Sequence, residues 1–246
     1  MLSVVIPVYN EEKIIKTSVT RLTEYLRSLC IPFEVLISDD GSRDSGAGAV
    51  STLSQKYSEI RLLCNPINRG KGAAVKDGML SARGDVIVFT DCDLAYGVEA
   101  IYDIYKRLKN GASDVIIGSR ALHPNGYEGY SAARKAFSER YLKVLNGVLK
   151  IPHSDFQCGI KGFTKEARDK IFPFCTVSGY AFDLEVLLLA EKQGLHVSEI
   201  PVKVLSEIKH KAKMKMLTEA VKMIRDVGRI KNTNYDGLLK DGVSEE

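Results

Sequence analysis

The chain has 246 residues, of which 45% are hydrophobic and 27% are charged, and it has no low-complexity tract. This length and composition predict one large globular domain and exclude an intrinsically disordered chain. The formal net charge is a mild +4, and we expect no nucleic-acid partner.

Cysteine usage and the apolar runs bear on where the protein works. The five cysteines are odd in number and contain no C-x-x-C spacing, which argues against a disulfide framework or a zinc knuckle and favours a reducing cytosol. Residues 2–6 are apolar but short and have no basic leader, so we expect no export signal. The longest apolar stretches, such as residues 184–190, fall far short of the roughly 20 residues that cross a bilayer. We therefore expect a cytoplasmic protein without a membrane span.

Short β-branched runs alternate with helical patterns in the first half of the chain. The runs occupy residues 2–6, 33–37, 60–64, 85–89 and 114–117. Between the first two runs, apolar residues recur at helical spacing, at Ile15, Val19, Leu22, Leu26 and Leu29. This alternation predicts a mostly parallel α/β sheet with helices on both faces. Because ligands of such sheets bind at the carboxyl ends of strands, the site should lie near Tyr9, Asp39, Asp91 and Arg120.

The second half of the chain is more varied. Residues 122–130 are rich in Gly, Tyr, His, Pro and Asn and predict a flap over the site, and helical patterns follow at residues 131–149 and 181–193. Residues 214–231 predict a basic amphipathic helix, with Met216, Ala220, Met223, Val227 and Ile230 on its apolar face. Such a helix can lie on an anionic membrane surface or pack on its own domain, and the pattern favours neither. We thus divide the chain into an α/β domain at residues 1–213, this helix, and a polar frayed tail at residues 232–246.

Acidic side chains follow two of the predicted strands. Asp91 and Asp93 come directly after a buried strand, at alternate positions that can share one ligand. Their hard oxygen atoms suit Mg²⁺ or Mn²⁺, although an isolated pair at this spacing is more often a solvated turn. Asp39 and Asp40 follow another strand, where an acid can also be a simple helix cap. Acids at the ends of two strands of one sheet favour a polar ligand over two coincident caps.

A glycine-rich segment, residues 68–75, combines two cations with the start of a helix, which can present N–H groups and positive charge to an anion. It lacks the Gly-Lys-Ser/Thr of a P-loop, and the first forty residues contain no glycine, which excludes a dinucleotide fingerprint after the first strand. The scattered histidines and the motif cysteines Cys92 and Cys158 show no nucleophile or metal pattern, so we interpret them as structural. Asp183 and Glu185 begin an apolar helix, where a capping or pairing role and a substrate role remain equally open.

Five motifs occur in the order found in family 2 glycosyltransferases. They are residues 5–11 (VIPVYNE), 39–42 (DDGS), 68–72 (NRGKG), 91–93 (DCD) and 118–120 (GSR). Residues 155–161 (DFQCGIK) and 180–185 (YAFDLE) resemble the polyprenyl-phosphate branch, above all the dolichyl-phosphate β-glucosyltransferases. The chain therefore resembles an inverting glycosyltransferase of the GT-A fold over roughly residues 2–213.

The resemblance implies roles for individual residues. The nucleotide sugar would be held by Pro7, Tyr9, Glu11, Asp39, Asp40, Asn68, Lys71 and Asp91. A Mg²⁺ or Mn²⁺ ion would be bound by Asp93 with Asp91 beside it, and the catalytic set would be Asp93, Arg120, Arg134 and Asp155. Arg134, Lys211 and Lys213 would contact the acceptor. The chain departs from its relatives at Ala95, where some have a Gln metal ligand, and at residues 210–213 (HKAK), where Gly-x-Ser-Lys is usual.

The implied reaction moves a sugar, with glucose the first choice, from a UDP-sugar to a polyprenyl or dolichyl phosphate at the cytoplasmic face of a membrane. Such an acceptor needs no carboxylate base, because a phosphate monoester with a second pKa of about 6 is already largely ionised at neutral pH. Four alternatives remain: a GDP-mannose or UDP-N-acetylglucosamine donor, a soluble glycan or protein acceptor, a catalytically silent nucleotide-sugar binding module, and a sugar nucleotidylyltransferase. The expected partners are the donor, the lipid phosphate, an anionic membrane surface, and either a membrane-embedded protein or a second copy of the chain.

Overall fold

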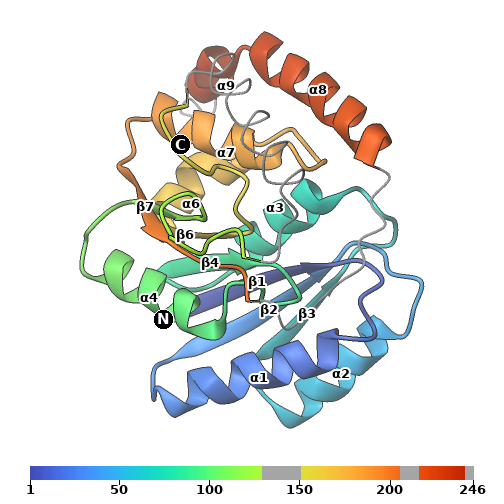
Figure 1. Cartoon of the computed structure of the whole chain (residues 1–246). Coiled ribbons are helices and arrows are strands. Elements are labelled where there is room, and N and C mark those ends of the chain that lie inside the picture. Colours follow the sequence, from blue (N-terminus) through green and yellow to red (C-terminus); the bar gives the residue numbers. More distant parts are fainter. Residues whose placement is uncertain (129–150, 206–215, 242–246) are drawn as a thin grey trace.

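The computed structural model describes residues 1–128, 151–205 and 216–241, and its centre is one seven-stranded sheet (Figure 1). In chain order the strands are β1 (Leu2–Val8), β2 (Phe33–Asp39), β3 (Ile60–Cys64), β4 (Val86–Thr90), β5 (Val115–Ser119), β6 (Ile160–Thr164) and β7 (Val197–Pro201). They lie in the order β3-β2-β1-β4-β6-β5-β7, and among them β6 alone runs antiparallel to its neighbours. The predicted mostly parallel α/β sheet is therefore confirmed.

Helices cover both faces of the sheet. One face carries α1 (Ile15–Ser28), α2 (Gly46–Lys56) and α4 (Val98–Lys109). The other carries α3 (Lys71–Ser81), α6 (Lys165–Ile171), the 3₁₀ turn η1 (Phe172–Phe174), α7 (Phe182–Lys192), α8 (Met216–Asn232) and α9 (Tyr235–Asp241). Figure 1 shows α1 and α2 on one side of the strands and α7, α8 and α9 on the opposite side.

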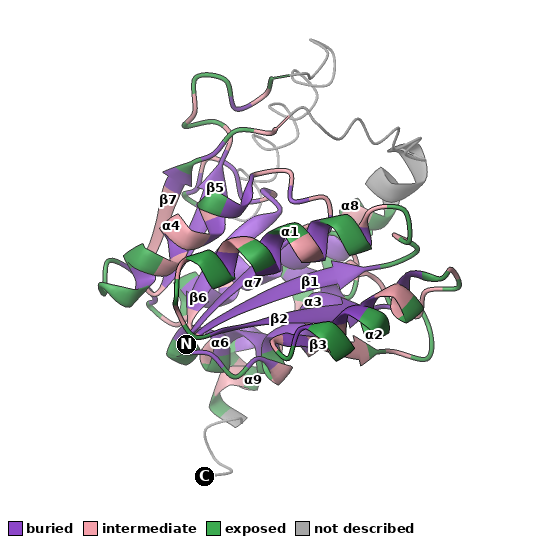
Figure 2. Ribbon diagram, turned by 90° about the horizontal axis from the view of Figure 1, so that it is seen from below, coloured by how far each residue is buried: buried purple, intermediate pink, exposed green. Residues whose placement is uncertain are grey.

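The sheet divides the core into two apolar clusters. Successive strand residues point to opposite faces, so Val4 and Ile6 pack under α1 while Val5 packs under α3. Both faces are covered, and this is why all seven residues of β1 and of β2 are buried. Figure 2 shows buried strands between helices whose outer sides are exposed.

Two strands were not predicted from the sequence. β6 contains Lys161 and Gly162, and β7 contains Ser198 and Glu199, so polar residues and a glycine interrupt the apolar pattern of both short strands. β6 is inserted between β4 and β5 from a distant part of the chain. Its neighbours therefore stabilise it more than its own residues do.

The C-terminal segment differs from the predicted frayed tail. Residues 235–241 form helix α9, and Tyr235 is only 1% exposed. In α8, Val227 and Ile230 are buried against the core of the domain, so this part of the apolar face is not available to a membrane. Residues 131–149 and 242–246, for which we predicted a helix and the end of the tail, lie outside the described residues.

Candidate active site

Most of the predicted site residues gather at one edge of the sheet. The carboxyl ends of the parallel strands lie there, and the chain reverses direction in β6, so the start of β6 reaches the same edge. Thr90 at the end of β4 pairs with Ile160 at the start of β6. The segment before β6 is thereby placed beside the segment after β4, which the linear sequence separates widely.

The loops after β1, β2 and β3 are tied together by hydrogen bonds. Asn10 N–H donates to Ser42 Oγ over 2.9 Å, and Arg43 N–H donates to Asn10 Oδ1 over 2.8 Å. Asp40 is 2% exposed, and its two carboxylate oxygens accept the N–H groups of Arg69 (2.9 Å) and Gly70 (2.7 Å). The loops predicted to hold the nucleotide thus form one rigid unit.

Further residues predicted to hold the nucleotide lie in β1, at the end of β2 or in the loops that follow β1 and β3. Pro7 is buried within β1, Tyr9 just after it is 42% exposed, and Glu11 is half-buried. Asp39 accepts the N–H and the hydroxyl of Ser42, as a turn-capping acid does. Asn68 is exposed in the loop after β3. The hydrogen bonds of Asp39 and Asp40 hold loops in place, and the contact of these residues with a nucleotide stays a prediction.

Asp91 lies between a cation and a glycine. Lys71 Nζ donates to Asp91 Oδ1 over 2.5 Å. Burial lowers the pKa of Lys71, but the Asp91 and Asp183 carboxylates more than offset this, so its pKa is raised and the ammonium stays charged. On the other side, a Cβ on Gly159 would come within 2.0 Å of Asp91 Oδ2. Only glycine at residue 159 leaves this carboxylate in place.

Asp93 is the better placed of the two acids to hold a metal ion. It is half-buried, and one of its oxygens, Oδ1, accepts the N–H of Ala95 over 3.1 Å. Within residues 1–128, 151–205 and 216–241, no three His, Cys, Asp or Glu side chains are grouped to hold a metal by themselves. The arrangement fits Mg²⁺ or Mn²⁺ bound by one or two carboxylates, with the other ligands from substrate phosphates and water.

The glycines of residues 68–72 have a packing role that we did not predict. A Cβ on Gly70 would meet Ser178 O at 2.4 Å, and one on Gly72 would meet Val177 O at 2.5 Å. The N–H groups of Gly72 and Ala73, at the start of α3, both donate to Ser178 O. Ser178 O therefore occupies two of the N–H groups of this segment, and the contact of the segment with an anion stays a prediction.

Two buried charges lie behind Lys71. Lys161 in β6 is 0% exposed, and its Nζ donates to Asp183 Oδ1 over 2.5 Å and to Cys158 O over 2.7 Å. Burial raises the pKa of Asp183, although Lys161 and Lys71 oppose the shift. Of the roles left open for Asp183, pairing with a cation is the one observed. Glu185 has a structural role of another kind, because it accepts hydrogen bonds from the N–H groups of Thr176 and Val177 and from the hydroxyl of Tyr235.

Arg120 is held in a fixed orientation at the end of β5. Its Nε and Nη2 donate to the two oxygens of Asp155 over 2.6 and 2.7 Å, and its own N–H donates to Asp155 Oδ2 over 3.0 Å. The guanidinium carbon lies 5.5 Å from the ring centre of Tyr127. Asp155 is 0% exposed, so it can act only by positioning Arg120 rather than by touching a substrate.

Three predicted residues, Arg134, Lys211 and Lys213, lie outside the described residues. The sequence also failed to indicate several groups that shape the site, namely Gly159, Lys161, Ser178 and Glu199. Gly159 and Lys161 lie within the recognised 155–161 motif, which was the available signal. Ser178 acts through its backbone carbonyl, which any residue supplies, so no residue pattern could have found it.

Solved structures of other proteins share this fold. Glucosyl-3-phosphoglycerate synthase of Mycobacterium tuberculosis, in complex with phosphoglyceric acid, superimposes with a TM-score of 0.69 at 19% identity, over 94% of this chain and 79% of that one. Mannosyl-3-phosphoglycerate synthase of Rubrobacter xylanophilus gives a TM-score of 0.62 at 14% identity, over 93% and 75%. The M. tuberculosis enzyme has also been solved with Mn²⁺ and UDP-glucose and with Mg²⁺ and UDP. At these identities the likeness establishes the fold.

Curated relatives are closer in sequence. A dolichyl-phosphate beta-glucosyltransferase of Trichomonas vaginalis is 34% identical over 244 residues, which are 93% of this chain and 72% of that protein. The proteins of the same name from Dictyostelium discoideum and Saccharomyces cerevisiae are each 31% identical, over 97% and 98% of this chain and 76% and 77% of theirs. The family model of glycosyl transferase family 2 matches residues 3–172. The chain, with its GT-A sheet and the family motifs gathered at one edge, therefore belongs to glycosyl transferase family 2.

Proposed function

We propose that this chain transfers glucose from UDP-glucose to a polyprenyl or dolichyl phosphate, forming a β-linked lipid-phosphate sugar. The observation that carries the proposal is the similarity to dolichyl-phosphate beta-glucosyltransferases over 93% to 98% of the chain. The charges at the sheet edge support it. Lys71 and Arg120 supply fixed cations for phosphate groups, and Asp91 and Asp93 supply carboxylates.

In the proposed reaction each residue acts by position and charge. Arg120, fixed by Asp155, stabilises negative charge on the departing diphosphate. Lys71 holds Asp91 in one orientation toward the donor. A divalent ion bound at Asp93 would neutralise charge on the same diphosphate when present. The acceptor phosphate is already ionised, so its needs are alignment and exclusion of water rather than a base.

The direct test is a donor panel with polyprenyl phosphate. Radiolabelled UDP-glucose, UDP-N-acetylglucosamine and GDP-mannose are each incubated with the chain, Mg²⁺ and the lipid, and the product is extracted into organic solvent. Label from UDP-glucose in the organic phase is the expected result. If the labelled sugar is instead transferred to an added soluble glycan, and so stays in the aqueous phase, the acceptor belongs to a different class. The absence of any donor turnover would indicate a binding module.

UDP is expected to bind at least about tenfold more tightly than GDP, a difference of about 1.4 kcal/mol. The expectation rests on the similarity to dolichyl-phosphate beta-glucosyltransferases and on the UDP found in structures of the fold neighbour from M. tuberculosis. Titration calorimetry of both nucleotides at one Mg²⁺ concentration measures the ratio. Tighter binding of GDP would overturn the choice of donor.

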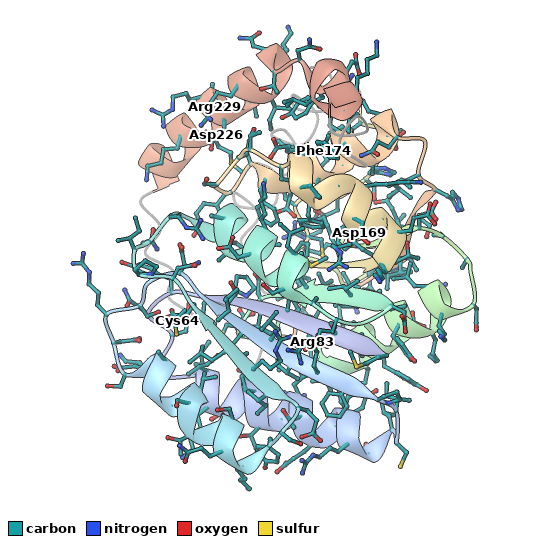
Figure 3. All side chains as sticks on the ribbon, turned by 180° about the vertical axis from the view of Figure 1, so that it is seen from behind. Cys64, Arg83, Asp169, Phe174, Asp226 and Arg229 are labelled. Carbon is teal, nitrogen blue, oxygen red and sulfur yellow. The ribbon has the colours of Figure 1, made fainter. Side chains whose placement is uncertain are left out.

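The protein is also proposed to work at a membrane surface. Among the described helices, none is long and apolar enough to cross a bilayer. Lys222, Arg225 and Arg229 recur at helical spacing on the exposed side of α8, away from the buried Val227 and Ile230; Figure 3 labels Arg229 together with Asp226 of the same helix. These cations, rather than the apolar face, are suited to anionic lipid headgroups.

Replacing Lys222, Arg225 and Arg229 by glutamine is expected to weaken binding to anionic vesicles on the order of 100-fold at low salt, because each cation contributes about 1 kcal/mol. The matched control replaces Lys16, Lys106 and Lys109, three exposed lysines on helices of the opposite face. Vesicle co-sedimentation across lipid charge and salt measures both. Equal binding by the two triple variants would remove α8 as the contact and favour a membrane-embedded partner or a second copy of the chain.

A further inference from the structure

Glu199, which is not among the predicted site residues, accepts several hydrogen bonds from the segment that carries Asp155. Glu199 lies in the middle of β7, and its Oε1 accepts the N–H of Ser154 over 3.0 Å, the Ser154 hydroxyl over 2.7 Å and the N–H of Asp155 over 3.3 Å. Its Oε2 lies 3.1 Å from the same Ser154 N–H. Two consecutive backbone amides and a hydroxyl thus converge on one side chain.

The segment bound by Glu199, namely Ser154 and Asp155, contacts Arg120 directly. Asp155 receives both Nε and Nη2 of Arg120, so a shift of the Asp155 backbone moves the guanidinium with it. The residue that follows β7 supports Arg120 by a second route, because Val202 N–H donates to the carbonyl of Ser119 over 3.0 Å. The Ser119 and Ser154 hydroxyls also lie 2.6 Å apart. The chain of contacts therefore runs from Glu199 through Ser154 and Asp155 to Arg120.

The charges of Arg120 and Asp155 indicate why Glu199 is needed in addition to Asp155. Burial lowers the pKa of Arg120, while the hydrogen bonds to Asp155 raise it, and the net result is a raised pKa and a permanent cation. Both oxygens of Asp155 accept hydrogen bonds from Arg120, and the backbone N–H of Asp155 donates to Glu199 instead. Backbone N–H groups beside a buried acid need an acceptor of their own, and Glu199 supplies it.

We propose that Glu199 is a positioning residue for the transfer reaction, which holds Arg120 in register with the departing diphosphate through Ser154 and Asp155. The proposal rests on the proposed function, since it concerns the rate of that reaction. Glu199 touches no substrate and acts on the catalytic rate through another residue. Misplacement of a catalytic group by about 1 Å costs on the order of 100-fold in rate.

The chain offers a matched control in Glu34 of β2. It too is a carboxylate on a strand that accepts a serine hydroxyl (Ser3, 2.7 Å) and a backbone N–H (Arg83, 2.7 Å). It pairs with Arg61 near the start of β2, at the sheet edge opposite the site. Losing Glu34 removes a similar network without reaching Arg120.

The experiment compares Glu199→Ala, Glu199→Gln and Glu34→Ala by steady-state kinetics, as UDP release from UDP-glucose with polyprenyl phosphate and Mg²⁺. Glu199→Ala is expected to lower kcat on the order of 10- to 100-fold, while the KM for donor changes by less than about threefold. Glu199→Gln keeps a carbonyl oxygen for the Ser154 contacts and should recover most of the rate. Glu34→Ala should lose stability at unchanged kcat.

A double-mutant cycle with Arg120→Lys tests the route. If Glu199 acts through the Arg120 fork, Glu199→Ala adds little to the Arg120→Lys variant, so the two effects are not additive. Full additivity, or an equal fall of kcat in Glu34→Ala, would overturn the proposal.

Hydrogen exchange separates a failure of this proposal from a failure of the proposed function. The amides of Ser154 and Asp155 should exchange faster in Glu199→Ala than in the native protein, while those of β1 stay protected. Unchanged protection would overturn the positioning role whatever the enzyme transfers. If protection is lost but the native protein transfers no sugar to polyprenyl phosphate, the positioning role of Glu199 stands and the proposed acceptor is wrong.

Discussion

Asp93→Ala is expected to lower metal-dependent sugar transfer on the order of 100- to 1000-fold, the loss seen when one preorganised electrostatic group is removed from a site. Asp93 follows β4 directly and is half-buried at the site edge. Asp91 is already paired with Lys71, so we expect it to compensate only weakly for the lost carboxylate. The measurement is the transfer rate with UDP-glucose across a titration of Mg²⁺ and Mn²⁺.

The control for this variant is Asp103→Ala. Asp103 lies on α4 and pairs with Arg107 one turn later, away from the strand ends. Its loss should leave the transfer rate unchanged. If Asp93→Ala and the native protein respond equally to added metal, Asp93 is not the metal ligand. If the variant loses activity but binds UDP and metal as the native protein does, its role lies in the chemical step.

Lys161→Met is expected to have the largest effect on stability, about 3–5 kcal/mol, because it leaves the Asp183 carboxylate buried without its cation. Lys161 is 0% exposed and its ammonium lies 5.4 Å from the Phe89 ring centre, so water cannot replace the lost partner without disrupting the core. Urea unfolding with a shared slope for the native protein and the variant measures the change.

Two further variants separate charge from packing. Lys161→Met combined with Asp183→Leu removes both charges and should regain most of the stability, since apolar replacement of a buried pair is often neutral. Lys170→Met breaks the exposed pair with Glu166 on α6 and should leave unfolding unchanged. A double variant as unstable as Lys161→Met would mean that side-chain packing, and not the unpaired carboxylate, dominates the loss.

The double variant also bears on activity. Asp183 raises the pKa of Lys71, so its removal leaves Lys71 with Asp91 as its one strong anionic neighbour among the described residues. A double variant that folds normally but transfers sugar slowly would show that the buried charges support the site as well as the fold.

The residue patterns alone indicated the family, the first five strands of the sheet and much of the site edge. β1, β2, β4 and β5 were predictable because strands buried on both faces are rich in β-branched and aromatic residues, whereas the partly buried β3 stood out by its place in the alternation with helical patterns. Asp39, Asp91 and Arg120 could be placed in the site because parallel strands bring their carboxyl ends to one edge. Both inferences rest on local patterns that a linear sequence displays.

Which of these groups contact one another follows from the folded arrangement and not from the residue pattern. β6 enters the sheet from far along the chain, and this alone puts Gly159 against Asp91 and Lys161 against Asp183. The glycines at residues 70 and 72 belong to a segment interpreted as able to bind an anion, yet a Cβ at either position would clash with a backbone carbonyl more than a hundred residues away. Likewise the amphipathic pattern of α8 suits either a membrane surface or the domain itself. The burial of Val227 in the core cluster shows that the domain covers part of its apolar face. Such contacts depend on distances across the fold, which residue types and their spacing do not encode locally.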